Sequence, residues 1–569
     1  MASPISSTGI ATGIDTTAMI NAILQQEGLP LQRLQARQTA NNNRATALQA
    51  FQSGLTSLSS SLATLGSTSF NARTVTSTDS TNAYVSATAT GAAVGTYDLK
   101  VAQIATKGRI SPTLVGGVPS NLAVLDPLTT TIFSGASASF AVKGTDGVIK
   151  TLTLGSSNNS LNGLRDAINA LGTADPNVPG SKGLGVVATV VNTGAGANPY
   201  QLVLTAKDTG TGTTAGVVTI ADVTTGAPVN TIGITAGTVD NMATPTTLSG
   251  GLTSGAGNVA VDANFTINGI ALTRKTNIVT DAADGVSFTL KQGGQATATS
   301  FTVALDKSSI TSAVQDALTK FNALVTTYKN ASGVGGPLAN DPSVRSFLTQ
   351  VRASLSGSPA GLAATAPFTS TADLGIKTNR DGSLTLDVTA FQAALDKDPE
   401  AAKRIFAFTG QSSNGVVSFF GASAKTTTGA VAFTISSFAS GGAVSGTFTV
   451  GGTPYTLSGS NGTLSGAAGT PLEGLVLSVT GTGSGSLNLS RGVGQAAQDL
   501  VSTLTASGTG NLAVILSSID QQNRTLTNQI SVGQARLDRR REVLRAQFAQ
   551  LEATIGQLQA AGQSLSGIA

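Results

Sequence analysis

The chain contains no cysteine, no histidine and no tryptophan, and only 11% of its 569 residues are charged. Without cysteine it can form no disulfide, thiolate nucleophile, iron–sulfur cluster or cysteine-ligated zinc site. Without histidine it lacks the commonest general base and metal ligand, which excludes every Ser-His and Cys-His catalytic arrangement. Only carboxylates, Lys, Tyr and Ser remain as catalytic candidates.

Net charge and long apolar runs are also scarce. The 33 basic and 29 acidic residues leave a net charge of +4, a weak signal from which we expect no nucleic-acid partner. No run reaches the ~18 uninterrupted apolar residues of a membrane span, so we expect none. No Lys or Arg precedes Arg33, so we also expect no cleaved signal peptide. These features favour a cytoplasmic protein or one exported without a cleaved leader.

Apolar residues at the N-terminal end recur with helical spacing. Asp15 is placed to cap a first helix, and we expect Gly28 and Pro30 to break it. The apolar positions of this segment are Ile20, Ile23, Leu24, Leu31 and Leu34. After a polar stretch at 38–44, steps of three and four residues form a heptad seam. This seam consists of Leu48, Phe51, Leu55, Leu58, Leu62 and Leu65.

The C-terminal end has a longer seam. One heptad position holds Leu516, Ile530, Leu537, Leu544, Leu551, Leu558 and Leu565. The companion position holds Leu512, Ile519 and Leu526, and later Phe548 and Ile555 lie one residue beyond it. The seam therefore rotates near Gly533. A continuous helix over 512–565 would be roughly 80 Å long at about 1.5 Å per residue, so it must pack along a partner, and the N-terminal helices are the obvious candidates.

Between about residues 72 and 305, short alternating runs rich in Thr, Val, Gly, Ser and Asn predict antiparallel strands and hairpins. One helix is expected inside this region, at 161–171, opened by Ser160. Helices return from Ser308, and a second strand-rich stretch covers about 429–489. The order helix, β, helix, β, helix predicts an α+β multidomain fold whose β parts are insertions into a helical body.

No motif carries convincing chemistry. The run at 379–382 looks at first like part of a calcium loop, but Lys377 and Val388 occupy the positions that should be acidic. We expect a tight turn there, with Gly382 at positive φ. Glycine-rich runs fit hairpin turns, and the scattered carboxylates show no convergent pair. We therefore expect no catalytic, cofactor-binding or metal-binding residue, and no enzyme activity.

Arginines cluster in the predicted C-terminal helix, interleaved with acidic residues. A nucleic-acid arm would be less neutralised, so we predict interhelical or intersubunit ion pairs. The residues predicted to form them are Arg536, Arg539, Arg540, Arg541, Glu542 and Arg545.

Seven blocks of sequence follow one another from end to end. They are ISSTGIATGID at 5–15, FNARTV at 70–75, GTYDLKVAQIA at 95–105, pieces of 267–290 that include Asn277, FNALV at 321–325 with Tyr328, pieces of 374–406, and RAQFAQLE at 545–552. In this order they resemble the flagellar filament cap family, also called hook-associated protein 2. The match is poor at about 109–250 and 425–470, which carry only the β prediction.

The resemblance implies a terminal coiled-coil leg, a helical bundle domain and inserted antiparallel all-β head domains. The leg would consist of 1–45 paired with 535–569, and the bundle domain of 46–71, 306–424 and 491–534. The β head domain would consist of 72–108 and 250–305, and its second part would be a hook-type repeat. Two insertions would complete the chain: a variable β head domain at 109–249 and an additional β-rich segment at 425–490.

The same resemblance implies roles for the seam residues. The coiled coil of the leg and its filament contact would use Ile20, Ile23, Leu24, Leu31, Leu34, Leu537, Leu544, Phe548, Leu551, Ile555, Leu558 and Leu565. The bundle core would use Leu48, Phe51, Leu55, Leu58, Leu62, Leu65, Ile519, Leu526 and Ile530.

The function implied by the resemblance is capping of the distal end of the bacterial flagellar filament by a ring-shaped oligomer that retains exported flagellin and promotes its folding and insertion. The implied partners are further copies of the chain, flagellin, the hook–filament junction protein, the flagellar export apparatus and a cytoplasmic export chaperone at the C-terminal helix. The implied location is extracellular, at the flagellum tip. Some members of the family act as adhesins, so a surface adhesin and a filament or junction subunit remain alternatives. Ring size and any adhesion ligand stay open.

Overall fold

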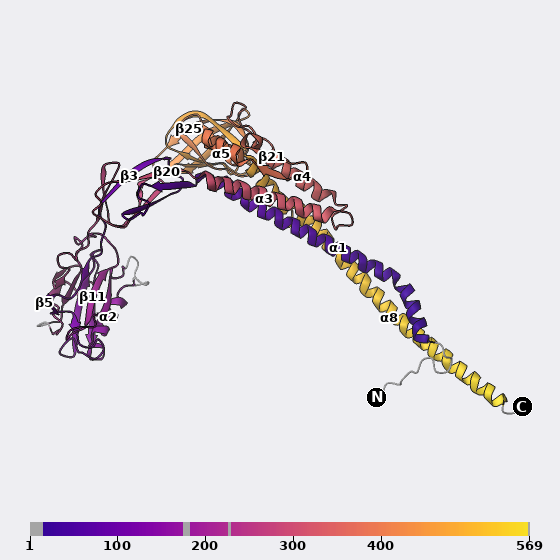
Figure 1. Ribbon diagram of the computed structural model, residues 1–569, viewed down its shortest axis with the longest axis horizontal. Coiled ribbons are helices and arrows are strands. Elements are labelled where there is room, and N and C mark those ends of the chain that lie inside the picture. Colours follow the sequence, from indigo (N-terminus) through magenta and orange to yellow (C-terminus); the bar gives the residue numbers. More distant parts are fainter. Residues whose placement is uncertain (1–14, 116, 174–181, 226–228, 567–569) are drawn as a thin grey trace. The chain divides into compact units, whose positions relative to one another are not determined.

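The computed structural model describes residues 15–115, 117–173, 182–225 and 229–566, and the chain divides into two compact units (Figure 1). The helical unit combines Met1–Phe70 with Lys307–Ala569, and the β unit is Asn71–Asp306. The β unit is thus an insertion into a helical body built from both ends of the chain. The predicted α+β multidomain fold is confirmed.

Long helices dominate the helical unit. They are α1 (Thr16–Ser67), α3 (Lys307–Ser332), α4 (Pro342–Ser356), α5 (Val388–Lys397), α6 (Pro399–Phe406), α7 (Val493–Thr505) and α8 (Asn511–Ser566), with the short 3₁₀ turns η1 (Ser69–Asn71) and η3 (Thr371–Leu374). α1 and α8 run side by side in Figure 1.

Helix α1 begins at its predicted cap, because Asp15 Oδ1 accepts a hydrogen bond of 2.8 Å from the backbone N–H of Ala18. It then continues through Pro30, so the predicted break at Gly28 and Pro30 is wrong. A proline inside a helix removes one backbone donor and bends the axis, and α1 bends toward its N-terminal end in Figure 1. The helix persists because apolar side chains on both sides of the proline, including buried Leu24, pack against α8.

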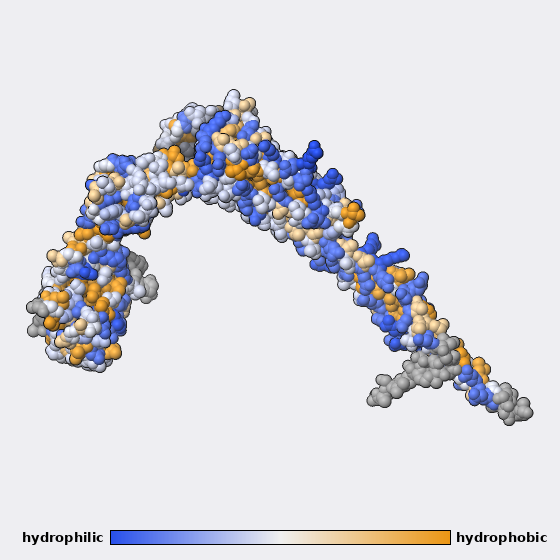
Figure 2. Space-filling model, in the orientation of Figure 1, coloured by the Kyte–Doolittle hydropathy of each residue, from blue (hydrophilic) through white to orange (hydrophobic). Residues whose placement is uncertain are grey.

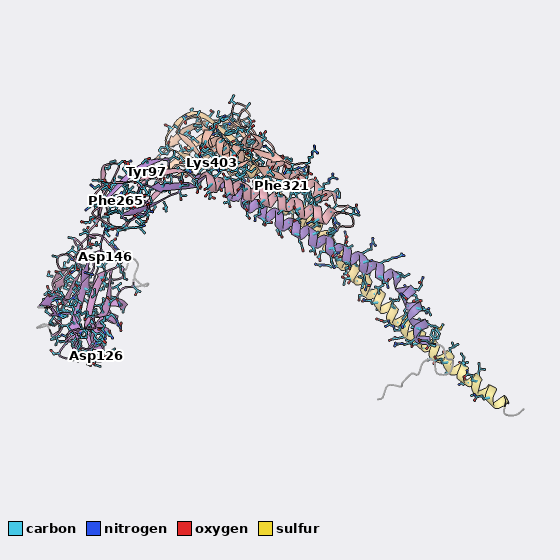
Figure 3. The ribbon with its side chains drawn as sticks, in the orientation of Figure 1. Tyr97, Asp126, Asp146, Phe265, Phe321 and Lys403 are labelled. Atoms are coloured by element: carbon cyan, nitrogen blue, oxygen red, sulfur yellow. The ribbon has the colours of Figure 1, made fainter. Side chains whose placement is uncertain are left out.

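The second half of α1 forms the core of the bundle with α3 and α7. All six residues of its heptad seam, from Leu48 to Leu65, are at most 2% exposed. Gly54 of α1 allows α3 to approach closely, since a Cβ atom there would lie 2.9 Å from Leu324 Cδ1. Phe321, labelled in Figure 3, is a fully buried member of the α3 stripe. No helix boundary separates this half of α1 from the half that precedes residue 46.

A small hairpin, β21 (Ile376–Thr378) and β22 (Leu384–Leu386), packs on α3. Its turn has Gly382 at φ +85°, as expected for a tight turn rather than a calcium loop. The side-chain amide of Asn322 pairs with both the N–H and the C=O of Leu384, each at 2.8 Å. Hydrogen bonds from Ser383 and Lys329 hold the pKa of Asp381 well below its usual range. The Asn322 amide thus joins two of the blocks that carry the family resemblance, 321–325 and the pieces of 374–406.

Replacing Asn322 by Ala should destabilise the helical unit by about 1–3 kcal/mol, because it leaves a half-buried backbone donor and acceptor of β22 unpaired. Urea denaturation followed by circular dichroism measures this change. Asn330→Ala, at an exposed position of the same helix, is the matched control and should stay within about 0.5 kcal/mol of the parent. Equal effects of the two substitutions would contradict the role assigned to the amide.

The second strand-rich stretch forms an 8-stranded antiparallel sheet in the order β23-β30-β25-β26-β27-β28-β29-β24. Its strands are β23 (Phe408–Ser412), β24 (Val417–Gly421), β25 (Gly429–Phe438), β26 (Ala443–Val450), β27 (Thr453–Ser460), β28 (Thr463–Ser465), β29 (Val476–Val479) and β30 (Gly483–Arg491). The sheet curls until its edge strands meet, since the rings of Phe408 and Phe419 stack at 5.6 Å. It begins at Phe408, whereas the sequence predicted helical bundle up to residue 424, because β23 and β24 are short and interrupted by glycine.

The β unit contains two hydrophobic clusters. The first lies between the 5-stranded sheet β1-β20-β3-β16-β17 and the 3-stranded sheet β18-β19-β2. These strands are β1 (Arg73–Ser77), β2 (Val85–Ala89), β3 (Gly95–Gln103), β16 (Ala263–Ile267), β17 (Ile270–Arg274), β18 (Ile278–Ala283), β19 (Val286–Leu290) and β20 (Thr299–Leu305). Tyr97 and Phe265, labelled in Figure 3, both pack in this cluster.

The second cluster uses only residues from 110 to 252. Its elements are β4 (Arg109–Ile110), β7 (Ala123–Val124), β8 (Ser137–Lys143), β9 (Ile149–Gly155), η2 (Ser156–Asn158), α2 (Leu161–Ala170), β10 (Val186–Asn192), β11 (Tyr200–Ala206), β12 (Thr219–Asp222) and β15 (Leu252–Thr253), with the hairpins β5 (Leu114–Val115)–β6 (Val118–Pro119) and β13 (Gly237–Val239)–β14 (Leu248–Gly250). Helix α2 starts at its predicted cap, since Ser160 Oγ accepts from Gly163 N at 3.1 Å. This segment therefore has a hydrophobic core of its own.

Candidate functional site: the paired helices α1 and α8

Helices α1 and α8 form an antiparallel pair. α8 is a single helix of 56 residues, and N-terminal positions of α1 lie beside C-terminal positions of α8. Arg540 Nε lies 3.2 Å from Glu27 Oε1, and further along Gln38 Nε2 donates to Thr527 Oγ1 at 2.7 Å. The continuous helix inferred from the spacing of the C-terminal seam, and its packing on the N-terminal segment, are confirmed.

An apolar cluster holds the pair together near the start of α1. Ile20, Leu24 and Leu544 are 4%, 8% and 5% exposed, and Ile23, Leu537 and Phe548 pack against them half-buried. Each apolar side chain buried in such a seam contributes about 1.5–3 kcal/mol.

The next step along the seam is built on two glycines. A Cβ atom on Gly533 would lie 3.2 Å from Leu31 Cδ1, and one on Gly28 would lie 3.7 Å from Leu537 Cδ1. Leu31 and Leu34 are half-buried at this point. The rotation of the seam predicted at Gly533 therefore coincides with a close approach of the two helices.

Polar side chains replace the apolar seam in the middle of the pair. Besides Gln38–Thr527, Asn523 Nδ2 donates to Asn42 Oδ1 at 2.8 Å and Asn41 Nδ2 to Gln522 Oε1 at 3.4 Å. These hydrogen bonds join exposed side chains, so they favour this alignment of the two helices and add little to its stability.

The polar band is also tied to the bundle. Arg44 donates through Nε and Nη2 to Asp341 Oδ2, at 3.1 and 2.8 Å, and Asp341 caps helix α4 through Ser343 N. The Asp341 side chain is only 3% exposed, so removing Arg44 would leave a buried carboxylate without its ion-pair partner.

Beyond the apolar cluster the described part of α8 outruns α1. Leu551 and Leu558 are 51% and 67% exposed, and Ile555 is half-buried. The side chain of Leu565 lies outside the described residues. Within the described part of the chain, Leu551 and Leu558 therefore do not belong to the seam between α1 and α8. Their contact with the filament stays a prediction. At the bundle end Ile519 and Ile530 are buried and Leu526 is half-buried.

The arginine cluster lies on the solvent side of α8. Arg540 pairs with Glu27 across the helices, and Arg541 pairs with Asp538 at 3.5 Å within α8. Among the described residues, Arg536, Arg539, Glu542 and Arg545 are exposed and have no ion pair within 4.0 Å. Figure 2 shows hydrophilic and hydrophobic side chains mixed along this helix pair.

The described ranges offer no other chemistry at this site. None of their helices combines the length and apolar character needed to cross a bilayer. They also bring no three acidic side chains together in a way that could hold a metal ion. What the helix pair provides is an elongated contact surface.

Comparison with known proteins gives one family. The profile described as Flagellar hook-associated protein 2 C-terminus matches residues 260–560, and its N-terminus counterpart matches 12–108. The B-type flagellar hook-associated protein 2 of Pseudomonas aeruginosa is 29% identical over 419 residues, which are 70% of this chain and 80% of that protein. The flagellar hook-associated protein 2 of Escherichia coli K12 is 25% identical over 408 residues, 69% and 78% of the two chains. The crystal structure of the D1, D2 and D3 domains of the Escherichia coli flagellar cap protein aligns with a TM-score of 0.48 at 24% identity, over 63% of this chain and 89% of that one.

Proposed function

The chain belongs to the flagellar hook-associated protein 2 family, and from this membership we propose that it caps the distal end of the flagellar filament as a ring-shaped oligomer. In this role it retains exported flagellin at the tip and promotes its folding and insertion. The family is one of structural flagellar cap proteins, which places its members at the filament, outside the cell.

The observation that carries the proposal is the match of both family profiles, because together they include most of α1 and α8. A cap must hold the filament and still move as subunits are added. The paired helices supply a long surface of small, repeated contacts, which can be exchanged stepwise. We propose that α1 and α8 form the leg that inserts into the open filament end, with further copies of the chain, flagellin and the junction protein as neighbours.

Deleting the coding sequence in a flagellated strain that carries it tests this function. We expect flagellin to appear unpolymerised in the medium, and electron microscopy to find hooks with few or no filaments. Restoring the full chain should restore filaments. Filaments of normal length in the deletion strain would overturn the capping role and favour a junction or accessory subunit.

An adhesin role is the second candidate, favoured by the separate core of the 110–252 cluster. Arg109 N donates to Asn258 O at 2.8 Å, so Gly108 and Asn258 can be joined directly while residues 109–257 are removed. We expect this variant to assemble filaments of normal length, since both family profiles lie essentially outside the deleted segment. Loss of bacterial attachment to host cells would assign adhesion to the segment, and unchanged attachment would remove the adhesin proposal.

A further inference from the structure

A groove opens between α1 and α8 where α1 contains Pro30. Its volume is about 810 Å³, and Leu31, Leu34, Leu537 and Val543 line its floor. Val543 is 47% exposed and the three leucines are half-buried, so their apolar surface is only partly covered by the described chain. The helices themselves approach closely here, since a Cβ atom on Gly533 would lie 3.2 Å from Leu31 Cδ1, so the groove runs along the surface beside this contact.

Arginines form the rim of the same groove. Arg536, Arg539 and Arg540 all line it, and Glu27 is the one acidic residue among the lining side chains. Glu27 is already engaged by Arg540 at 3.2 Å, so Arg536 and Arg539 remain as exposed cations with no ion pair among the described residues. The rim therefore presents uncompensated positive charge above an apolar floor.

The positive charge of the chain is concentrated on these helices. α1 and α8 carry nine basic and five acidic side chains, a net charge of +4, which equals the net charge of the whole sequence. Two such helix pairs would repel one another. Charge complementarity therefore argues against a second copy of the chain as the occupant of the groove. It favours an acidic partner.

The shape and the apolar floor narrow the choice further. The α8 side of the groove, from Gly533 to Val543, is about 15 Å long, which matches two to three turns of a helix. An amphipathic helix lays its apolar face into such a groove, whereas a lipid surface binds a convex apolar face. A phosphate backbone would leave the apolar floor of the groove uncovered, whereas the apolar face of an amphipathic helix would cover it.

We propose that the groove lined by Leu31, Leu34, Leu537, Arg536 and Arg539 is a docking site for an acidic amphipathic helix of another protein. The apolar face of that helix covers the leucines, and its carboxylates pair with the two arginines. This inference goes beyond the capping role, because it fixes the chemistry of a partner and holds whether or not the chain forms a ring.

Fluorescence anisotropy of the full-length chain with a labelled peptide tests the site. The probe is an 18-residue helical peptide with leucines on one face and glutamates on the other, and its partner peptide has every glutamate replaced by lysine. We expect the acidic peptide to bind and the lysine peptide not to bind, with affinity falling as salt is raised. Arg536→Glu/Arg539→Glu should weaken binding of the acidic peptide about tenfold or more, and Arg536→Gln/Arg539→Gln should weaken it less.

The matched control is Arg345→Glu/Arg524→Glu, which removes the same charge from exposed positions outside the groove and should leave the affinity within about twofold. Circular dichroism confirms that each variant keeps its helices. Equal binding of the two peptides, or equal loss in the groove and control variants, would overturn the proposal. The proposal would also be overturned if the chain sedimented with phosphatidylserine vesicles and did not bind the acidic peptide, since this would assign the surface to a membrane. It would likewise be overturned if the chain dimerised and the groove variant abolished the dimer, since this would assign the surface to a second copy.

Discussion

Replacing Arg491 by Met should destabilise the helical unit by about 3 kcal/mol, because it removes the cation beside a largely buried carboxylate, Asp499, whose remaining partner is the Gln495 amide at 2.8 Å. Arg491 ends strand β30, and its Nη1 lies 3.4 Å from Asp499 Oδ2 of α7, with side-chain exposures of 20% and 18%. Its Nη2 donates to the carbonyls of Ala424 and Thr426 at 2.7 and 2.8 Å. One side chain thus fastens the curled sheet to the bundle, and methionine of similar length replaces none of these contacts.

Thermal and urea unfolding of the full chain measure the effect. Arg524→Met is the matched control, since it removes an Arg–Asp pair within one helix, Arg524–Asp520, whose side chains are 79% and 61% exposed. It should cost less than about 0.5 kcal/mol. The double variant Arg491→Met/Asp499→Leu should recover part of the loss by removing the stranded charge. If the two single substitutions cost the same, Arg491 does not link the sheet to the bundle.

The importance of Arg491 could not be predicted from the sequence. Two of its acceptors are backbone carbonyls more than sixty positions away, at Ala424 and Thr426. Backbone groups have no sequence signature, and a single arginine at the end of a predicted strand normally indicates a solvated position. Only the closure of the sheet against α7 brings these groups together.

Heptad spacing, in contrast, predicted the long helices because the same apolar positions that repeat along the sequence must face one partner. The break predicted from Gly28 and Pro30 was wrong, because packing of Leu24 and Leu31 on α8 keeps the helix continuous against the local propensity. Heptad spacing also could not reveal that residues 38–42 form hydrogen bonds to α8, since a polar stretch indicates a linker and a polar seam equally well.

The blocks that carried the family resemblance have structural roles that the sequence did not disclose. Asn277 pairs through its amide with both the N–H and the C=O of Ala105, at 2.7 and 2.8 Å, in the same way that Asn322 pairs with Leu384. Each amide joins two blocks that are distant along the chain. Without cysteine, the protein fastens its parts with such amides rather than with disulfides.

Replacing Leu544 by Asp should open the paired helices at their apolar cluster while leaving the bundle folded. Leu544 is 5% exposed against Ile20 and Leu24, and a carboxylate at that position loses the burial of leucine and meets no donor within the cluster. The combined cost is about 3 kcal/mol or more, so amide hydrogens of α1 over residues 16–34 should exchange roughly a hundredfold faster. Hydrogen-exchange mass spectrometry of the purified chain measures this directly, and amides of residues 48–65 serve as the internal reference because their own core is separate.

Leu558→Asp is the matched control for that substitution, since Leu558 lies on the same helix but is 67% exposed. In the purified chain it should leave the exchange of α1 unchanged. The two variants therefore distinguish the pairing of α1 with α8 from the contact of α8 with the filament. If the leg must be paired before it enters the filament, only Leu544→Asp releases unpolymerised flagellin. If exposed leucines of α8 contact the filament as proposed, Leu558→Asp also releases flagellin, although its helix pair is intact. Normal filaments with both variants would contradict a leg built from α1 and α8, because neither the pairing nor the exposed end of α8 would then matter for retention at the tip.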